Sequence, residues 1–148
     1  AMTKQYVALL RGFVVEQQEI DSPVKNEKGN YKDAKSSLVP IRCVELNIAV
    51  APYATARYSY VHFYPTTGRT HQLRIHANKI SHPIIGDPKH GNRHHNHMFE
   101  HELQLPNLFL HAKALTFKHP FTNETIHIEA PLPHFWSQFD EQTVKHSL

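Results

Sequence analysis

An alternating strand is the feature of this sequence that most restricts its fold. In RYSYVHFY (57–64) the three tyrosines and His62 fall on one side of an extended chain, and Ser59, Val61 and Phe63 fall on the other. An aromatic-rich face of this kind is more often packed into a core than used as a platform for nucleic-acid bases. The pattern therefore predicts a strand that is buried within a sheet.

The residues after this strand change to a helical period. PTTG (65–68) breaks the strand, and Leu73, Ala77 and Ile80 then recur at the spacing of one helical face. Arg74 lies on a neighbouring polar face, about 100° around the helix from Leu73. We expect a short helix whose apolar stripe packs on the sheet and whose polar face carries Arg74.

The rest of the chain predicts further strands around this unit. Apolar or alternating runs predict strands at 4–15, 41–50, 108–119 and 124–130, the last two as a hairpin. The polar segment 19–37 reads as a mobile loop, and 131–142 reads as a short helix anchored by Phe135, Trp136 and Phe139. The expected fold class is α+β with a mixed, mainly antiparallel sheet, and the 148 residues form one unit.

Composition excludes several classes of protein. No stretch approaches the roughly 20 apolar residues that span a bilayer, and the first residues lack the order of a secretory signal. Cys43 is the single cysteine, which excludes an internal disulfide and fits a reducing compartment. We expect a cytoplasmic protein without a membrane partner.

The charge is distributed unevenly along the chain, whose net charge is +3. No Asp or Glu occurs between Glu45 and Asp87, a stretch that contains three arginines, Lys79 and several histidines. A long positive segment without acids suits a polyanion such as RNA or DNA. A solvated basic surface explains the same charges equally well, so this pattern leaves both readings open.

A histidine-rich segment, HGNRHHNHMFEH (90–101), raises the possibility of a metal site. Four of its histidines have nearly helical spacing, but Pro88, Gly91 and two asparagines weaken a helix. No cysteine lies nearby, and no H-E-x-x-H motif occurs. We therefore expect a polar, flexible loop and no resident metal, with a metal-binding protein as the remote alternative.

Three motifs together resemble one family. GRTHQLRIHANKISHPIIGDPKHG (68–91) resembles the signature G-R-[TS]-H-Q-[LI]-R-x-H followed by H-P-I-x-G-D of the RluA-type pseudouridine synthases. KQYVALLRG (4–12) resembles their K-x-Y-x-A-x-x-x-G strand, and LFLHAKAL (108–115) resembles their L-x-L-H-A strand. The order of the motifs is also that of the family, and HGNRHHN (90–96) is most similar to its tRNA pseudouridine synthase C branch.

The resemblance implies an enzyme that isomerises uridine in RNA without a metal or an organic cofactor. It implies that Tyr6 stacks on the flipped base and is the proposed proton-abstracting group. Arg74 would pair with the catalytic aspartate and hold the base out of its stack, and Leu110 would form the apolar floor. A guanidinium suits such a role because it keeps its charge, pairs bidentately with carboxylates and stacks on rings.

RNA, and transfer RNA in particular, is the implied partner. The candidate RNA contacts share the basic segment or the family signature, and they are Arg57, Arg69, Thr70, His71, Gln72, His76 and Lys79. The glycine before the helix also predicts free backbone N–H groups near Arg69 and Thr70 that could seat a phosphate.

One departure from the family concerns its nucleophile, an aspartate in an R-L-D-x-x-T-S-G sequence. None of the four aspartates, Asp21, Asp33, Asp87 and Asp140, lies in such a sequence. We expect the 148 residues to be the carboxyl-terminal part of a catalytic domain, to be inactive alone, and to self-associate through an exposed sheet edge. The alternative is an RNA-binding module that performs no chemistry.

Overall fold

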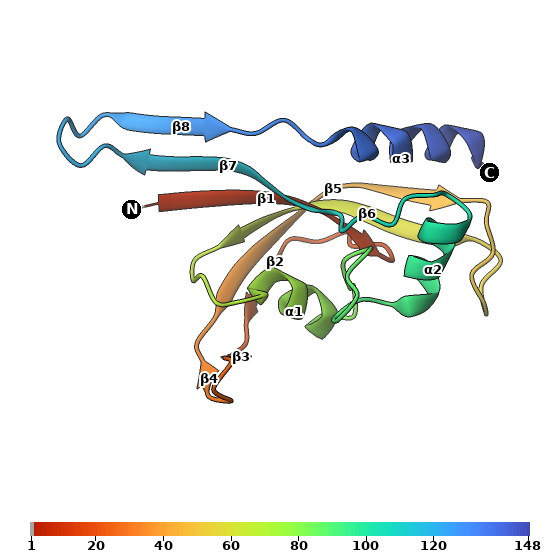
Figure 1. The fold of residues 1–148 in the computed structure, drawn as a ribbon, viewed down its shortest axis with the longest axis horizontal. Coiled ribbons are helices and arrows are strands. Elements are labelled where there is room, and N and C mark those ends of the chain that lie inside the picture. The colour runs from red at the N-terminus through yellow and green to blue at the C-terminus, as the bar shows by residue number, and fades with distance from the viewer. Residues whose placement is uncertain (1) are drawn as a thin grey trace.

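The fold is built on one antiparallel sheet that runs through most of the chain. The computed structural model describes residues 2–148. The sheet has the strand order β2-β5-β6-β1-β7-β8, formed by Gln18–Asp21, Lys35–Leu46, Ala56–Pro65, Met2–Arg11, Leu110–Lys118 and Thr125–Glu129 (Figure 1). Every strand pairing within the described residues is antiparallel. The α+β class with a mainly antiparallel sheet is therefore confirmed.

Three helices cover the sheet. Helix α1 (Gln72–Lys79) follows β6, α2 (Arg93–His101) lies between α1 and β7, and α3 (His134–Lys145) ends the fold. Figure 1 shows α1 and α3 on opposite sides of the sheet. No helix of the described residues is long and apolar enough to cross a membrane.

The sheet buries apolar side chains on both faces. On one face Tyr58 and Tyr60 of β6 pack with Phe99 of α2 and with Trp136 and Phe139 of α3. Burying an aromatic side chain of this size contributes about 1.5–3 kcal/mol, so this cluster is a large part of the folding energy. The predicted helix 131–142, with Trp136 and Phe139 as anchors, is confirmed.

The other face receives α1. Val61 and Phe63 of β6 lie in a second cluster with Leu73 and Ala77, and Ile80 packs against it. The predicted stripe of α1 is therefore confirmed. Tyr58 and Tyr60 pack into the core as predicted for the aromatic face of 57–64, and the opposite face of this strand is buried as well.

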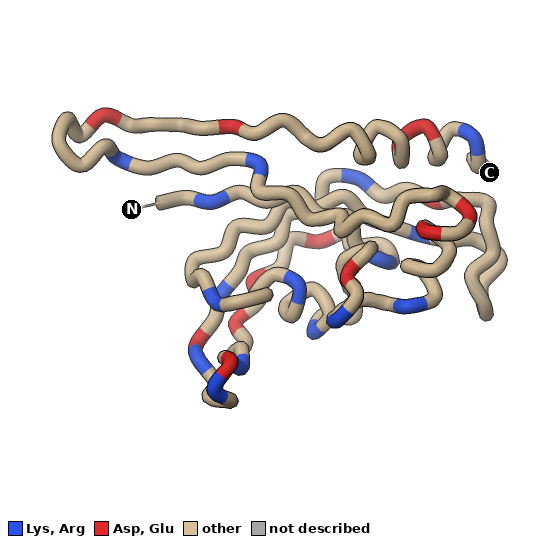
Figure 2. Tube along the Cα trace, in the orientation of Figure 1, with Lys and Arg blue, Asp and Glu red and all other residues tan. Residues whose placement is uncertain are grey.

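The segment 19–37 is ordered, so the predicted mobile loop is wrong. It contains β2, the two-residue strands β3 (Val24–Lys25) and β4 (Tyr31–Lys32), and the start of β5. The buried side chains Ile20, Val24 and Ala34 anchor it. An outer strand and a hairpin need few apolar residues. These strands are therefore polar in composition and lack the apolar pattern from which a strand is predicted. Figure 2 shows basic and acidic residues mixed along the projecting β3–β4 hairpin, whose basic residues are all lysines.

The histidine-rich segment forms α2, so the loop predicted at 90–101 is also wrong. The side chain of Asn92 accepts hydrogen bonds from the N–H groups of His94 (2.9 Å) and His95 (3.1 Å) and caps the helix. Met98 and Phe99 pack into the core. The asparagine that weakened the helical reading is thus the residue that starts the helix, as short polar side chains do at N-caps.

The two outer strands of the sheet are β2 and β8. β7 and β8 form the predicted hairpin, and β8 pairs with β7 alone among the described strands. Self-association through such an edge stays a prediction.

Candidate functional site

The hollow that contains the family motifs lies between the start of β1, the start of β7 and α1. It has a volume of about 370 Å³ and is lined by Tyr6, Arg74 and Leu110 together with residues of the 65–73 segment. These three residues are far apart in sequence, and the fold brings them together. A volume of this order is in the range that accommodates a small organic group.

Tyr6 reaches the hollow from the middle of the sheet. Its backbone lies opposite Phe63 of β6 on one side and Ala112 of β7 on the other. The pairing with β7 shifts register between Gln5 and Tyr6. Such an irregularity bends a strand and changes the direction of its side chains, so it contributes to the orientation of the Tyr6 ring toward the hollow.

Leucine side chains supply the apolar part of the hollow. Leu110 is the first residue of β7 and lies opposite Ala8 of β1, and Leu108 precedes it in the same lining. Both pack against the cluster beneath α1. The lining thus rests on the hydrophobic core, which keeps it in place.

Arg74 forms a two-pronged ion pair with Asp87. Its Nε donates to Oδ2 at 2.9 Å and its Nη2 donates to Oδ1 at 2.8 Å. The Asp87 side chain is fully buried and that of Arg74 is 17% exposed. The resemblance implied that Arg74 pairs with the catalytic aspartate, whereas in the structure it pairs with Asp87, an aspartate outside the family's nucleophile motif. Three of the five guanidinium N–H donors remain for other partners.

Asp87 is fixed from several directions. Its Oδ1 also accepts hydrogen bonds from the backbone N–H groups of Lys89 (3.0 Å) and His90 (2.9 Å). Burial disfavours its charge, but the Arg74 hydrogen bonds and the two backbone donors outweigh burial and lower the pKa of Asp87 below its usual 3.8. The same carboxylate raises the pKa of Arg74. Both groups are charged at neutral pH.

This ion pair predicts a specific response to acid. Because the folded-state pKa of Asp87 is depressed, its contribution to stability is complete above the ordinary value near 3.8 and is lost as pH falls through the folded-state value. At pH 7 we expect the wild-type protein to unfold at a higher urea concentration than the Asp87→Asn variant. This difference between the two unfolding midpoints should become smaller below about pH 4. Urea unfolding followed by circular dichroism at several pH values measures it. A difference that stays constant down to pH of about 3 contradicts the role assigned to Asp87.

Two candidate RNA contacts are instead interior residues. Gln72 donates from Nε2 to Lys35 O and Ser36 Oγ, both at 2.9 Å, and its Oε1 accepts from Thr67 Oγ1 at 2.6 Å and from Arg69 N at 3.0 Å. The Gln72 side chain thus has all its polar positions occupied. It fastens the turn before α1 to β5.

His76 is the second correction. It is fully buried, with Nδ1 2.9 Å from Ser36 Oγ and Nε2 2.8 Å from Ser22 O. Position 76 follows position 72 by one helical turn, and both side chains face β5. The free N–H predicted at Arg69 is also occupied, since it donates to Gln72.

The other basic candidates surround the hollow unevenly. Arg69 and His71 line it, and Arg69 also lines an adjoining groove with Thr70 and the β3–β4 hairpin. His71 Nδ1 lies 3.4 Å from His90 Nε2 at the exposed rim. Lys79 ends α1 and does not line the hollow.

Arg57 lies elsewhere. It is the second residue of β6, whereas the hollow lies beside the end of that strand at Pro65. Its Nε is 3.3 Å from Glu45 Oε2. Arg57 therefore does not contribute to the site that contains Tyr6 and Arg74.

Lys4 is a lining residue that the sequence reasoning did not single out. It points into the same hollow as Tyr6. The signal was present, because residues two apart on a strand share a face and Lys4 and Tyr6 stand in one motif. Among residues 2–148, no three His, Cys, Asp or Glu side chains converge to hold a metal ion.

The chain is similar to known proteins in sequence and in fold. Residues 1–79 match the sequence profile of the RNA pseudouridylate synthase family. The chain is 35% identical over 152 residues to the tRNA pseudouridine synthase C of Vibrio vulnificus, covering 95% of this chain and 62% of that protein. It is 38% identical over 146 residues to that of Vibrio cholerae, covering 91% and 60%.

A solved structure supports the same assignment. Human RNA pseudouridylate synthase domain containing 1 aligns with a TM-score of 0.67 and 30% identity over 93% of this chain and 57% of that one. The chain therefore belongs to the RNA pseudouridylate synthase family, of the RluA type. Within it, the relatives named above are tRNA pseudouridine synthases C, and the chain spans about three fifths of their length.

Proposed function

We propose that the hollow of Tyr6, Arg74 and Leu110 receives a uridine turned out of an RNA strand, and that the protein containing this chain isomerises it to pseudouridine. The convergence of these three side chains on one hollow carries the proposal. They come from three motifs far apart in the sequence. An enzyme that acts on a base must extrude it from its stack, and it needs a pocket that holds the base.

The chemistry of the hollow suits a uracil ring. Leu108 and Leu110 offer an apolar surface for the ring, and Tyr6 offers an aromatic face with a hydroxyl at one edge. Arg74 has free N–H donors for carbonyl or phosphate oxygens, and its pairing with Asp87 restricts its orientation. An arginine held in this way loses less entropy on binding than a mobile one.

Isomerisation exchanges the bond between ribose and a ring nitrogen for a bond to a ring carbon. The carbon that becomes attached must lose its proton, and the nitrogen that is released must gain one. We assign the first of these transfers to the Tyr6 hydroxyl, which lies in the hollow and on the strand with Lys4. This is general base catalysis by a positioned side chain.

The nucleophile is assigned to a residue outside the present sequence. No carboxylate is among the residues that line the hollow within 2–148, and Asp87 is engaged by Arg74 and the turn. The family's R-L-D-x-x-T-S-G sequence does not occur in the 148 residues. We therefore propose that an aspartate-bearing segment completes the hollow and that the 148 residues alone lack turnover.

Transfer RNA is the proposed substrate class and the cytoplasm the proposed compartment. The named relatives are tRNA pseudouridine synthases. Around the hollow, Lys4, Arg69 and the lysines of the β3–β4 hairpin provide positive charge for phosphates. Affinity for RNA that depends on such contacts falls steeply with added salt.

The test compares two proteins on bulk transfer RNA. One is the 148-residue chain, and the other carries an R-L-D-x-x-T-S-G segment ahead of it. Pseudouridine is measured by mass spectrometry after nuclease digestion. We expect the longer protein to form pseudouridine and the 148 residues to form none.

The control is the longer protein with the aspartate of the added segment replaced by asparagine, which should be inactive. Turnover by the 148 residues alone would overturn the assignment of the nucleophile. RNA binding without turnover by the longer protein would favour a binding module.

A further inference from the structure

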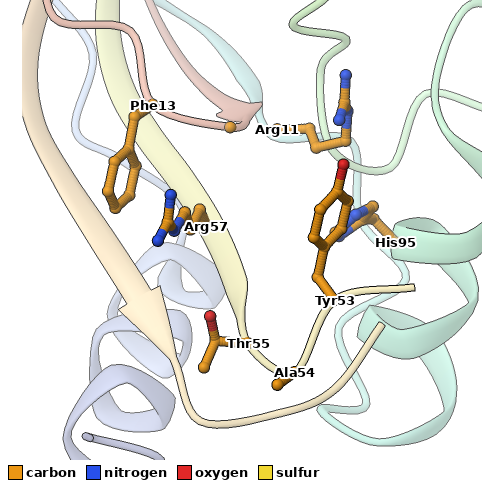
Figure 3. A pocket seen from close by; sticks show the side chains of 8 residues that line it. Arg11, Phe13, Tyr53, Ala54, Thr55, Arg57 and His95 are labelled. Atoms are coloured by element: carbon orange, nitrogen blue, oxygen red, sulfur yellow. The ribbon is translucent and has the colours of Figure 1, made fainter. Parts of the chain in front are cut away.

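A second hollow, larger than the first, lies at the other end of strands β1 and β6. It has a volume of about 690 Å³ and is formed by the residues that follow β1 and by the connection between β5 and β6 (Figure 3). It shares no lining residue with the hollow of Tyr6 and Arg74. Tyr6 and Arg11 lie five positions apart on β1, so the two hollows are separated by roughly 17 Å along the strand.

Two arginines and no carboxylate line this hollow. Among residues 2–148, no carboxylate lies within ion-pair distance of Arg11, whose Nη2 donates to Ser81 O at 2.7 Å. The Nε of Arg11 is buried and has no hydrogen-bond partner. No described carboxylate neutralises the charge of Arg11, and an arginine without such a partner favours an anionic ligand.

Arg57 supplies the second positive charge. It approaches Glu45 through Nε alone, which leaves its terminal N–H groups for another partner. Its guanidinium lies over the Phe13 ring, 5.0 Å from the centroid. Figure 3 shows Arg57 beside Phe13 on one side of the hollow and Tyr53 beside His95 on the other.

Exposed aromatic rings complete the lining. Tyr53 is 66% exposed and Phe13 is 37% exposed, so neither is a core residue. Burial first, and then the charge of Arg11, lower the pKa of His95 to about 4, so this wall of the hollow is neutral at pH 7. Aromatic faces beside arginines are the combination that holds unpaired bases and their phosphates in single-strand binding proteins.

We propose that this second hollow binds an unpaired nucleotide of the RNA substrate, with its base stacked on Tyr53 and its phosphate held by Arg11 and Arg57. The inference rests on the proposed function, because the occupant belongs to the same RNA whose uridine enters the first hollow. It explains why exposed aromatic rings lie beside Arg11 and Arg57 at a distance from Tyr6. The site contributes affinity and positions the strand, and it takes no part in the reaction.

The experiment measures binding of a fluorescent oligouridylate of about 15 nucleotides, a length within the range of single-strand sites. Tyr53→Ala and Arg57→Gln should each weaken binding about tenfold. Arg57→Gln should also reduce the slope of the logarithm of the binding constant against the logarithm of the salt concentration by about one. The matched controls are Phe121→Ala and Lys118→Gln, an exposed ring and an exposed charge on the β7–β8 hairpin. These controls should bind as wild type does. Thermal unfolding verifies that each variant is folded.

Two further measurements distinguish a failure of this inference from a failure of the proposed function. Arg69→Gln tests the first hollow, and ultraviolet cross-linking followed by mass spectrometry should find RNA on the peptide containing Tyr53. If Arg69→Gln weakens binding while Tyr53→Ala and Arg57→Gln match the controls, the inference fails and the proposed function stands. If wild type shows no salt-dependent RNA binding, both fail. Cross-links to an acidic protein partner at Tyr53, with none to RNA, would also overturn the inference.

Discussion

Replacing Asp87 with alanine is expected to lower the free energy of unfolding by roughly 3–5 kcal/mol, as the loss of one partner of a buried ion pair does. The substitution leaves the Arg74 guanidinium without its two-pronged acceptor in a site where it is largely buried. It also removes the acceptor for the N–H groups of Lys89 and His90. The loss of stability should therefore have two causes, the unpaired charge of Arg74 and the loss of hydrogen bonds in the turn at residues 87–90.

The matched control is Asp21→Ala. Asp21 pairs with Lys35 at 3.9 Å, and the two side chains are 69% and 63% exposed. Exposed pairs contribute about 0–1 kcal/mol, so this variant should unfold nearly as wild type does. Chemical unfolding of both variants gives the comparison. Equal losses in the two variants would mean that burial of the Arg74–Asp87 pair does not determine its contribution.

Replacing Tyr6 with phenylalanine in the complete enzyme should reduce turnover by about 10²–10⁴-fold, the usual contribution of a positioned acid or base. The variant keeps the ring, and with it the apolar contacts of the hollow, but loses the hydroxyl. RNA affinity should therefore change little. Single-turnover rates and RNA binding, measured on the same preparation, distinguish the two effects.

Tyr64→Phe is the control for this variant. Tyr64 lies on β6 and accepts a hydrogen bond from Gln5 at 3.3 Å, next to the hollow but outside its lining. Its loss should leave turnover close to that of wild type. If Tyr6→Phe kept the wild-type rate, the proton transfer would belong to another group.

The regular elements with strong apolar periodicity could be predicted from the sequence. Residues 57–64 alternate between two packed faces, the α1 stripe recurs at every helical turn, and the β7–β8 hairpin consists of two runs rich in apolar residues, so these patterns are visible without a structure. The segment 19–37 and α2 could not be predicted in the same way. β2 and the β3–β4 hairpin bury few side chains, and α2 depends on a cap at Asn92 and on two core residues.

The candidate site was predictable in its motif residues and not in its supporting contacts. The motifs located Tyr6, Arg74 and Leu110, and these three share one hollow. Polar residues of the same motif have two different uses, and the sequence does not distinguish them. Gln72 and His76 form hydrogen bonds inside the protein, and Gln72 also borders the hollow, whereas Arg69 and His71 line the hollow with exposed side chains. The Arg74–Asp87 pairing joins two segments whose approach depends on the whole fold.

The several hydrogen bonds on Asp87 restrict how this region can change during evolution. In many ion pairs the two charges can be exchanged by two substitutions, since each partner has only the other. Here Oδ1 of Asp87 serves Arg74 and two backbone N–H groups at once. An arginine at position 87 would present donors to those donors, so reversing the pair leaves the turn unsatisfied. Arginine and aspartate therefore cannot be exchanged between positions 74 and 87. A protein that has lost one of the two residues cannot restore the ion pair by placing the opposite charges at these positions.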